Sequence, residues 1–176
     1  AAFRGKAAGD SCVVLDTRTF EAFGGLHVPG SFHIDFRGNF ATFAGWIMPP
    51  DKDILLVSET PGQVQEATMW LRRVGLDRTV GYLKGGMAEW TKAGFPAAHL
   101  PQLSVEELHT MAAAGNKAMT LVDVRAPAEY DSYHVQNAVN IPVQDVRTRY
   151  RELDKNLPVV VVCSTGIRSS IGGSML

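Results

Sequence analysis

The sequence predicts an α/β protein with two similar domains, each a mostly parallel sheet flanked by helices. The first observation is an internal repeat, since Val14 to Ile34 aligns without a gap to Leu121 to Ile141. The second is an alternation, in each copy, of short β-branched runs with helical segments, which is typical of parallel sheets covered by helices. The third is a segment rich in Pro and Ala between the copies, Ala93 to Leu103, which has the composition of a linker. We therefore expect one domain over residues 1–98 and a second over residues 99–176.

The repeat has a constant separation of 107 residues. Asp16 aligns with Asp123, Arg18 with Arg125, Phe23 with Tyr130, His27 with His134 and Ile34 with Ile141. A period this long exceeds that of solenoid repeats and is typical of a duplicated domain.

The expected strands of the first copy are 12–16, 54–58 and 79–83, and those of the second are 119–124, 138–141 and 158–163. Residues 63–75 carry apolar side chains at helical spacing and end with arginines and a glycine. The second copy opens with a helix in which Ser104 and Glu107 form a capping-box pattern and Gly115 ends the helix. A further helix is expected over 146–153.

The composition excludes several classes of partner. The chain has 176 residues, 45% of them hydrophobic and 20% charged, and a net charge of −1. This balance gives no electrostatic reason to expect nucleic acid or an anionic membrane as partner. No apolar stretch approaches the roughly 18 residues that span a bilayer, and the first residues do not form a signal peptide. The two cysteines do not make a disulfide framework, so a reducing, cytoplasmic setting is expected.

The loop "CSTGIRSS", Cys163 to Ser170, carries the strongest chemical signal. Ligands of parallel sheets bind at the carboxyl ends of the strands, where Cys163 is expected. A helix starting near Ile167 would aim backbone N–H groups into the loop, which would lower the pKa of the thiol. Gly166 permits unusual backbone angles, and Arg168 adds a permanent charge. We therefore predict a nucleophilic thiolate at Cys163, with Ser164, Thr165, Gly166, Ile167, Arg168 and Ser169 as the substrate-binding loop.

A single cysteine after four valines is more often an apolar core residue, but the Gly, Arg and Ser that follow favour the nucleophile. Cys12 has no such sequence after it and is expected to be structural. The spacing from Cys163 to Arg168 is Cys-x4-Arg, one residue shorter than the Cys-x5-Arg loop of protein tyrosine and dual-specificity phosphatases. A shorter loop encloses a smaller volume, which favours a persulfide over a phosphocysteine.

These motifs resemble a rhodanese (sulfurtransferase) domain. The second copy is similar through "LVDVRAPAEYDSYHVQNAVNIP" and the Cys-x-x-G-x-R-S loop, although Asn137 stands where the family usually has glycine. The first copy is similar through "HVPGSFHI" and "GYLKGGMAEWTKAGFP". The resemblance implies sulfur transfer through a Cys163 persulfide, without metal or organic cofactor. The partners that it implies are a small-molecule sulfur donor, such as thiosulfate or a persulfide, and a thiol, sulfite or cyanide acceptor.

A narrower resemblance comes from "FATFAGWIMP", "LVSE" and "WLRRVGLD". These stretches are similar to the tandem rhodanese region of bacterial fusion proteins that carry a metallo-β-lactamase-fold domain, in which the metal domain oxidises persulfides. The resemblance implies such a domain as a partner within a longer bacterial protein. The chain itself contains no His-x-His-x-Asp-His stretch.

The first copy is expected to be catalytically inactive. Ser58 stands in place of the cysteine, Pro61 has no N–H to donate, and Glu59 adds a negative charge. Counting from Ser58 puts Gln63 opposite Arg168. Four changes at one site indicate that the anion-binding loop has been lost.

The inactive copy also serves as a control for shared residues. His27 and His134 occur in both copies, so we expect them to be structural. The same reasoning predicts that Asp16 with Arg18, and Asp123 with Arg125, are ion pairs rather than acid–base pairs. The three tryptophans, Trp46, Trp70 and Trp90, are expected to pack in the core or between domains.

Two other functions stay open at this stage. One is a non-catalytic docking or regulatory module of a larger persulfide-metabolising protein, and a weaker one is a phosphatase-like or arsenate reductase-like enzyme. The second copy stops soon after Arg168, without the last strand and helix of the first copy. We therefore expect the second domain to be incomplete at its C-terminal end and the chain to be part of a longer protein.

Overall fold

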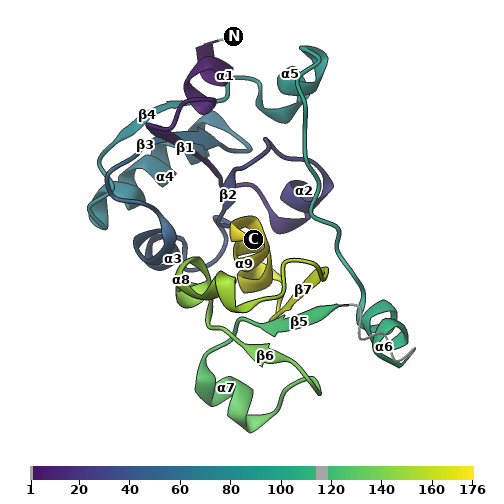
Figure 1. Ribbon diagram of the computed structural model, residues 1–176. Coiled ribbons are helices and arrows are strands. Elements are labelled where there is room, and N and C mark those ends of the chain that lie inside the picture. Colours follow the sequence, from purple (N-terminus) through teal and green to yellow (C-terminus); the bar gives the residue numbers. More distant parts are fainter. Residues whose placement is uncertain (1, 114–118) are drawn as a thin grey trace. The chain divides into compact units, whose positions relative to one another are not determined.

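The computed structural model describes residues 2–113 and 119–176 (Figure 1). The chain divides into two compact units, Ala1–Leu100 and Pro101–Leu176, so the division lies two residues beyond position 98. The expected end of a helix at Gly115 lies outside the described residues.

The first unit contains a four-stranded sheet in the order β2-β1-β3-β4, and every pairing in it is parallel. Helices connect the strands, as a parallel sheet requires. The elements are α1 (Ala2–Ala7), β1 (Cys12–Asp16), α2 (Phe20–Gly25), β2 (Phe32–His33), α3 (Phe40–Ile47), β3 (Asp53–Val57), α4 (Pro61–Arg73), β4 (Thr79–Tyr82) and α5 (Gly86–Lys92).

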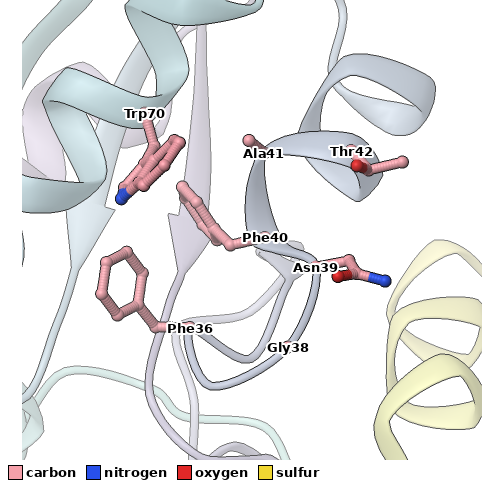
Figure 2. Close-up of a pocket in the computed structure, with 7 residues that line it drawn as sticks. All are labelled: Phe36, Gly38, Asn39, Phe40, Ala41, Thr42 and Trp70. Carbon is pink, nitrogen blue, oxygen red and sulfur yellow. The ribbon is translucent and has the colours of Figure 1, made fainter.

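A pocket of about 380 Å³ lies beside α3 and α4 of this unit, as Figure 2 shows. It is lined by Phe36, Gly38, Asn39, Phe40, Ala41, Thr42 and Trp70. Of the three tryptophans, Trp90 packs in the core and is 4% exposed, whereas Trp46 and Trp70 do not pack in the core of this unit. Those two are 52% and 38% exposed because α3 and α4 place them on their solvent side.

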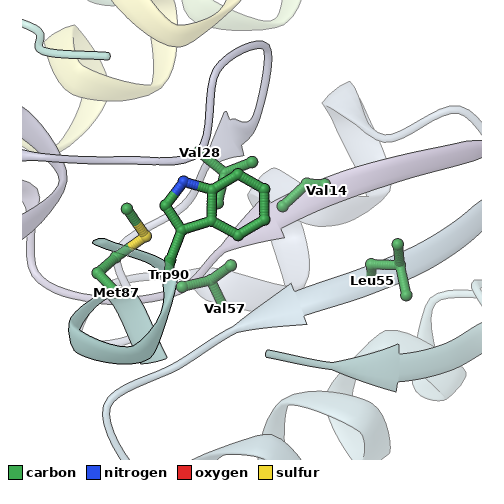
Figure 3. Packing of buried hydrophobic residues seen from close by; sticks show 6 residues of the cluster. All are labelled: Val14, Val28, Leu55, Val57, Met87 and Trp90. Atoms are coloured by element: carbon green, nitrogen blue, oxygen red, sulfur yellow. The ribbon is translucent and has the colours of Figure 1, made fainter. Parts of the chain in front are cut away.

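The two inner strands of the sheet in the first unit, β1 and β3, are buried on both faces along most of their length. On one face, Val14, Leu55 and Val57 pack against Trp90 and Met87 of α5 (Figure 3). Side chains alternate along a strand, so Leu56 projects from the opposite face. The run "ILLV" of β3 is therefore apolar at every position, as expected of a central parallel strand.

The second unit contains a three-stranded parallel sheet in the order β6-β5-β7. Its first helix is capped as predicted: the Ser104 N–H donates to Glu107 and the Glu107 N–H donates to the Ser104 hydroxyl. The elements are α6 (Val105–Ala113), β5 (Thr120–Asp123), α7 (Pro127–Ser132), β6 (Val139–Asn140), the 3₁₀ helix η1 (Val143–Asp145), α8 (Val146–Arg149), the 3₁₀ helix η2 (Tyr150–Glu152), β7 (Val159–Val162) and α9 (Ile167–Met175).

Both units confirm the predicted fold class, an α/β protein with two parallel sheets flanked by helices. None of the helices formed by the described residues combines the length and apolar character needed to cross a membrane.

Candidate active site

Cys163 and Ser58 occupy equivalent places in the two sheets. The last residue of β7, Val162, pairs with Asp123, and the last residue of β3, Val57, pairs with Asp16. Because Asp16 and Asp123 are repeat partners, the residues that follow these strands, Ser58 and Cys163, lie at the same carboxyl end of the sheet. This is the end where open parallel sheets bind their ligands.

Helix α9 begins at Ile167, where the sequence predicts a helix start, and its N-terminus faces Cys163. Gly166 caps the helix with φ 92°, a left-handed conformation that favours glycine. Helix α9 lies close to the sheet, since a Cβ on Gly172 would be only 3.2 Å from side-chain carbons of Val124 and Val161. This packing fixes the direction in which the first N–H groups of α9 point.

The sulfur of Cys163 accepts hydrogen bonds from this helix start. The backbone N–H groups of Gly166 and Ser169 donate to Sγ at 3.2 and 3.3 Å, and the Ser169 hydroxyl lies 3.5 Å from Sγ. Burial by itself raises the pKa of the thiol. The Ser169 hydroxyl and the backbone N–H groups of Thr165, Ser169 and Gly166 outweigh that effect and hold the pKa of Cys163 below its ordinary value. The loop therefore favours the nucleophilic thiolate.

Arg168 forms a two-pronged ion pair with Glu129 at the edge of this loop. Its Nη1 donates to Glu129 Oε2 at 2.6 Å, and its Nη2 donates to Oε1 at 2.9 Å. Nη2 also donates to the hydroxyl of Ser164, the residue next to Cys163, at 3.0 Å. The bonds from Arg168 lower the pKa of Glu129 to about 2, so this carboxyl stays charged at neutral pH. The structure thus pairs the charge of Arg168 with a carboxylate.

Sequence reasoning did not assign Glu129 to the site. Glu129 lies 39 residues before Arg168, in α7, and no motif spacing connects the two. The repeat did contain a signal, because the constant separation of 107 residues places Ala22 opposite Glu129. A charged residue present only in the copy that has the cysteine is a candidate for the site.

The loop of the first unit is one residue shorter than sequence counting implies. Helix α4 is capped by Thr60, two residues after Ser58, whereas α9 is capped by Gly166, three residues after Cys163. The first N–H···O bonds of the two helices agree, since Val64 bonds to Thr60 and Ser170 bonds to Gly166. Gln63 is therefore the structural counterpart of Ser169, and its placement opposite Arg168 is wrong. The reason is the early helix start, which Thr60 as N-cap and Pro61 at the first helical position favour.

The side chain of Gln63 bridges this shorter loop. Its Oε1 accepts from the Glu59 N–H at 2.8 Å, and its Nε2 donates to the Thr17 carbonyl at 3.1 Å. The hydroxyls of Ser58 and Thr17 are 2.7 Å apart and hydrogen-bonded. In the second unit the repeat partner of Thr17 is Val124, which has no hydroxyl to offer Cys163. The Glu59 N–H and the Ser58 hydroxyl of this loop are thus both hydrogen-bonded within the first unit.

The residues that the two copies share make the same contacts in both. Arg18 donates to Asp16 and to the Leu26 carbonyl, and Arg125 donates to Asp123 and to the Tyr133 carbonyl. These contacts confirm the predicted ion pairs, which connect the end of a strand to the end of the next helix. The two histidines likewise stack on aromatic rings: His27 on Phe23 at 3.9 Å between ring centroids, and His134 on Tyr130 at 3.8 Å. Their contacts are the same with and without a cysteine in the unit, as expected of structural residues.

Comparison with known protein families matches both copies to one family. The rhodanese-like domain family matches residues 2–93 and 104–176. Thiosulfate sulfurtransferase PspE of Escherichia coli (strain K12) is 44% identical over 50 residues, which cover 27% of this chain and 48% of PspE. Adenylyltransferase and sulfurtransferase MOCS3 of Drosophila sechellia is 38% identical over 77 residues, 40% of this chain and 17% of that protein. The chain thus spans less than half the length of these relatives.

Among solved structures, the Rhodanese_3 like domain of the Alr3790 protein from Anabaena sp. superposes with a TM-score of 0.47. It is 24% identical, and the match covers 53% of this chain and 97% of that domain. Thiosulfate sulfurtransferase from Pseudomonas aeruginosa superposes with a TM-score of 0.42 at 19% identity, over 94% of this chain and 37% of that protein.

Proposed function

Because the chain belongs to the rhodanese-like domain family, we propose that its second unit transfers sulfane sulfur through a persulfide on Cys163. The observation that supports this most directly is the set of N–H donors on Sγ, which favours a thiolate at the carboxyl end of a parallel sheet. Ser164, Thr165, Gly166, Ile167, Arg168 and Ser169 form the loop that binds the donor. The first unit, with Ser58 in place of the cysteine, is inactive in this proposal.

The reaction has two balanced steps. In the first, the Cys163 thiolate attacks the outer sulfur of a donor such as thiosulfate, a Cys–S–S bond forms, and the donor's S–S bond breaks. The leaving group, sulfite in this case, departs with the bonding electron pair. In the second, an acceptor attacks the outer sulfur and the Cys163 thiolate leaves. Donor and acceptor thus react in turn with one nucleophile, which is the ping-pong pattern of covalent catalysis.

The Ser169 hydroxyl and the N–H groups of the loop serve both steps. They stabilise the attacking thiolate in the first step and the same thiolate as leaving group in the second. The donor oxidises the Cys163 thiolate to a persulfide in the first step and the acceptor restores the thiolate in the second, so the protein is unchanged over the two steps and the proposal needs no metal or organic cofactor. The donor class in this proposal is thiosulfate or a low-molecular-weight persulfide, and the acceptor is a thiol, sulfite or cyanide.

The proposal includes a cellular setting. A thiolate nucleophile that must stay unblocked suits the reducing cytoplasm, and both cysteines are free thiols. A metallo-β-lactamase-fold domain that oxidises persulfides would be a suitable neighbour in a longer bacterial protein, since a persulfide is common to both reactions.

Intact-protein and peptide mass spectrometry after incubation with thiosulfate tests the proposal. We expect a mass gain of one sulfur atom on Cys163, its removal by cyanide or a thiol, and no gain in Cys163→Ser. A chain that stays unmodified under conditions in which a known sulfurtransferase is loaded would overturn the proposal and favour a docking module.

A further inference from the structure

The ion pair between Glu129 and Arg168 alters the charge that a sulfur donor meets. An arginine six residues into a cysteine loop would by itself present a full positive charge to a dianion such as thiosulfate. Here both terminal nitrogens of Arg168 donate to the Glu129 carboxylate, with the geometry of a strong fork-to-fork pair. The net charge of the pair is therefore zero.

The location of the pair makes this neutralisation relevant to Cys163. The same Nη2 that donates to Glu129 also donates to Ser164 Oγ, so the guanidinium is bonded to the residue next to Cys163. The side chains of Arg168 and Glu129 are 22% and 41% exposed, so an incoming donor can approach both. The Glu129 carboxylate also accepts a hydrogen bond from its own helix start, where the Ala126 N–H donates to Oε2 at 3.1 Å.

The inactive unit lacks both members of the pair. Ala22 replaces Glu129 in the repeat, and Gly62 is the structural counterpart of Arg168 once the shorter loop is taken into account. The pairs that hold strand to helix, such as Asp123 with Arg125, are present in both units. The two units share the fold, but the unit without the cysteine has no counterpart of the Glu129–Arg168 pair.

We propose that Glu129 is a specificity-determining residue, which pairs with Arg168 and thereby disfavours dianionic sulfur donors relative to donors of lower charge. The inference rests on the proposed function for its biological meaning. Its physical content, a carboxylate that weakens the attraction of anions to Cys163, can be measured on the thiol without any sulfur transfer.

Two alkylating reagents of similar size provide the measurement. Iodoacetate is anionic and iodoacetamide is neutral, and both react only with the thiolate. The ratio of their rate constants at Cys163 therefore cancels any change in the fraction of thiolate and reports the local charge. Glu129→Gln removes the charge with little change of shape. Asp131→Asn removes a charge from an exposed residue of the same helix that lies two positions away, and serves as the matched control.

We expect Glu129→Gln to raise the iodoacetate-to-iodoacetamide ratio about twofold to fivefold, the size expected of one partly exposed charge interaction. The increase should shrink in 1 M salt, because salt screens exposed charges. Asp131→Asn should leave the ratio near the wild-type value. Arg168→Ala should lower it, because the Glu129 carboxylate then has no partner. An unchanged or lower ratio in Glu129→Gln, or an equal rise in Asp131→Asn, would overturn the proposal.

A structural role for Glu129 gives a different result. Glu129→Asp keeps the charge but shortens the side chain, and we expect a ratio close to that of the wild type. If Glu129→Asp raises the ratio as much as Glu129→Gln, position rather than charge matters and the proposal is wrong. In sulfur transfer, Glu129→Gln should lower the KM for thiosulfate more than that for a singly charged persulfide donor. A chain without any transfer activity would overturn the proposed function, while the alkylation ratio would still decide the role of Glu129.

Discussion

The loops after β3 and after β7 leave equivalent strands at the same end of similar parallel sheets, yet they begin with Ser58 and Cys163 respectively. After β7, the helix start donates N–H groups to the Cys163 sulfur. After β3, helix α4 begins one residue earlier than α9 does after β7, and the Gln63 side chain accepts a hydrogen bond from the Glu59 N–H. The comparison shows that the fold supplies the location, whereas the length and sequence of one turn decide whether its backbone N–H groups donate to the residue that follows the strand or to another side chain of the loop.

The two strands also differ in burial. The residues Ile54 to Val57 of β3 are at most 1% exposed, whereas all four valines of β7 are only partly buried. Strand β3 lies between β1 and β4, whereas β7 pairs only with β5 among the described residues. The loop without the cysteine therefore follows the more deeply buried strand, so burial of the preceding strand does not indicate which loop carries the cysteine.

The largest expected effect is the loss of the nucleophile. Cys163→Ser should lower sulfur transfer by on the order of a thousandfold or more, because a serine hydroxyl is not ionised at neutral pH. Ser58→Ala, the matched change in the other unit, should leave transfer unchanged. Thiosulfate-to-cyanide transfer measures both variants, with circular dichroism to confirm folding. Substantial transfer by Cys163→Ser would show that another group carries the sulfur.

The next prediction tests whether a cysteine at position 58 is enough to make the loop of the first unit react with a sulfur donor. In the Cys163→Ser background, Ser58→Cys should form a persulfide at less than about one hundredth of the rate of Cys163. The reason is that the Gln63 N–H, the counterpart of the Ser169 N–H, donates to the Thr60 hydroxyl, and the Glu59 N–H donates to the Gln63 side chain. Mass spectrometry after a timed incubation with thiosulfate gives the rate. Loading at a rate near that of Cys163 would mean that the loop donors contribute little.

The smallest effect concerns the Ser169 hydroxyl, which lies 3.5 Å from the Cys163 sulfur. Removing the hydroxyl in Ser169→Ala should raise the pKa of Cys163, since that hydroxyl favours the charged form against the opposing effect of burial. A higher pKa leaves a smaller fraction of Cys163 as thiolate at pH 7. Alkylation of Cys163 by iodoacetamide should therefore be about threefold to tenfold slower, which is the effect of one hydrogen bond. Ser174→Ala, on the same helix, is the control, because the Ser174 hydroxyl donates to the Ile171 carbonyl. A pH–rate profile that does not move to higher pH in Ser169→Ala would contradict this role.

Much of the fold could be predicted from local patterns. A helix start near Ile167 and unusual backbone angles at Gly166 were both expected, and both are found, because a left-handed glycine and a helix start depend on neighbouring residues. The ion pair of Asp123 with Arg125 followed from the repeat, since both members are close in the chain and recur in both copies. The sequence alone also singled out Cys163 as the candidate nucleophile.

Only the tertiary structure decided the electrostatics of the loop. Glu129 and Arg168 belong to different helices, and the parallel sheet brings together elements that are far apart in the chain. Likewise, the placement of Gln63 with Ser169 depended on where α4 begins, which a residue count from Ser58 cannot give. The sequence by itself determined the fold class, the repeat and the candidate cysteine, because short-range patterns encode them. The structure decided which charges and N–H groups face that cysteine, because those contacts depend on packing between distant segments.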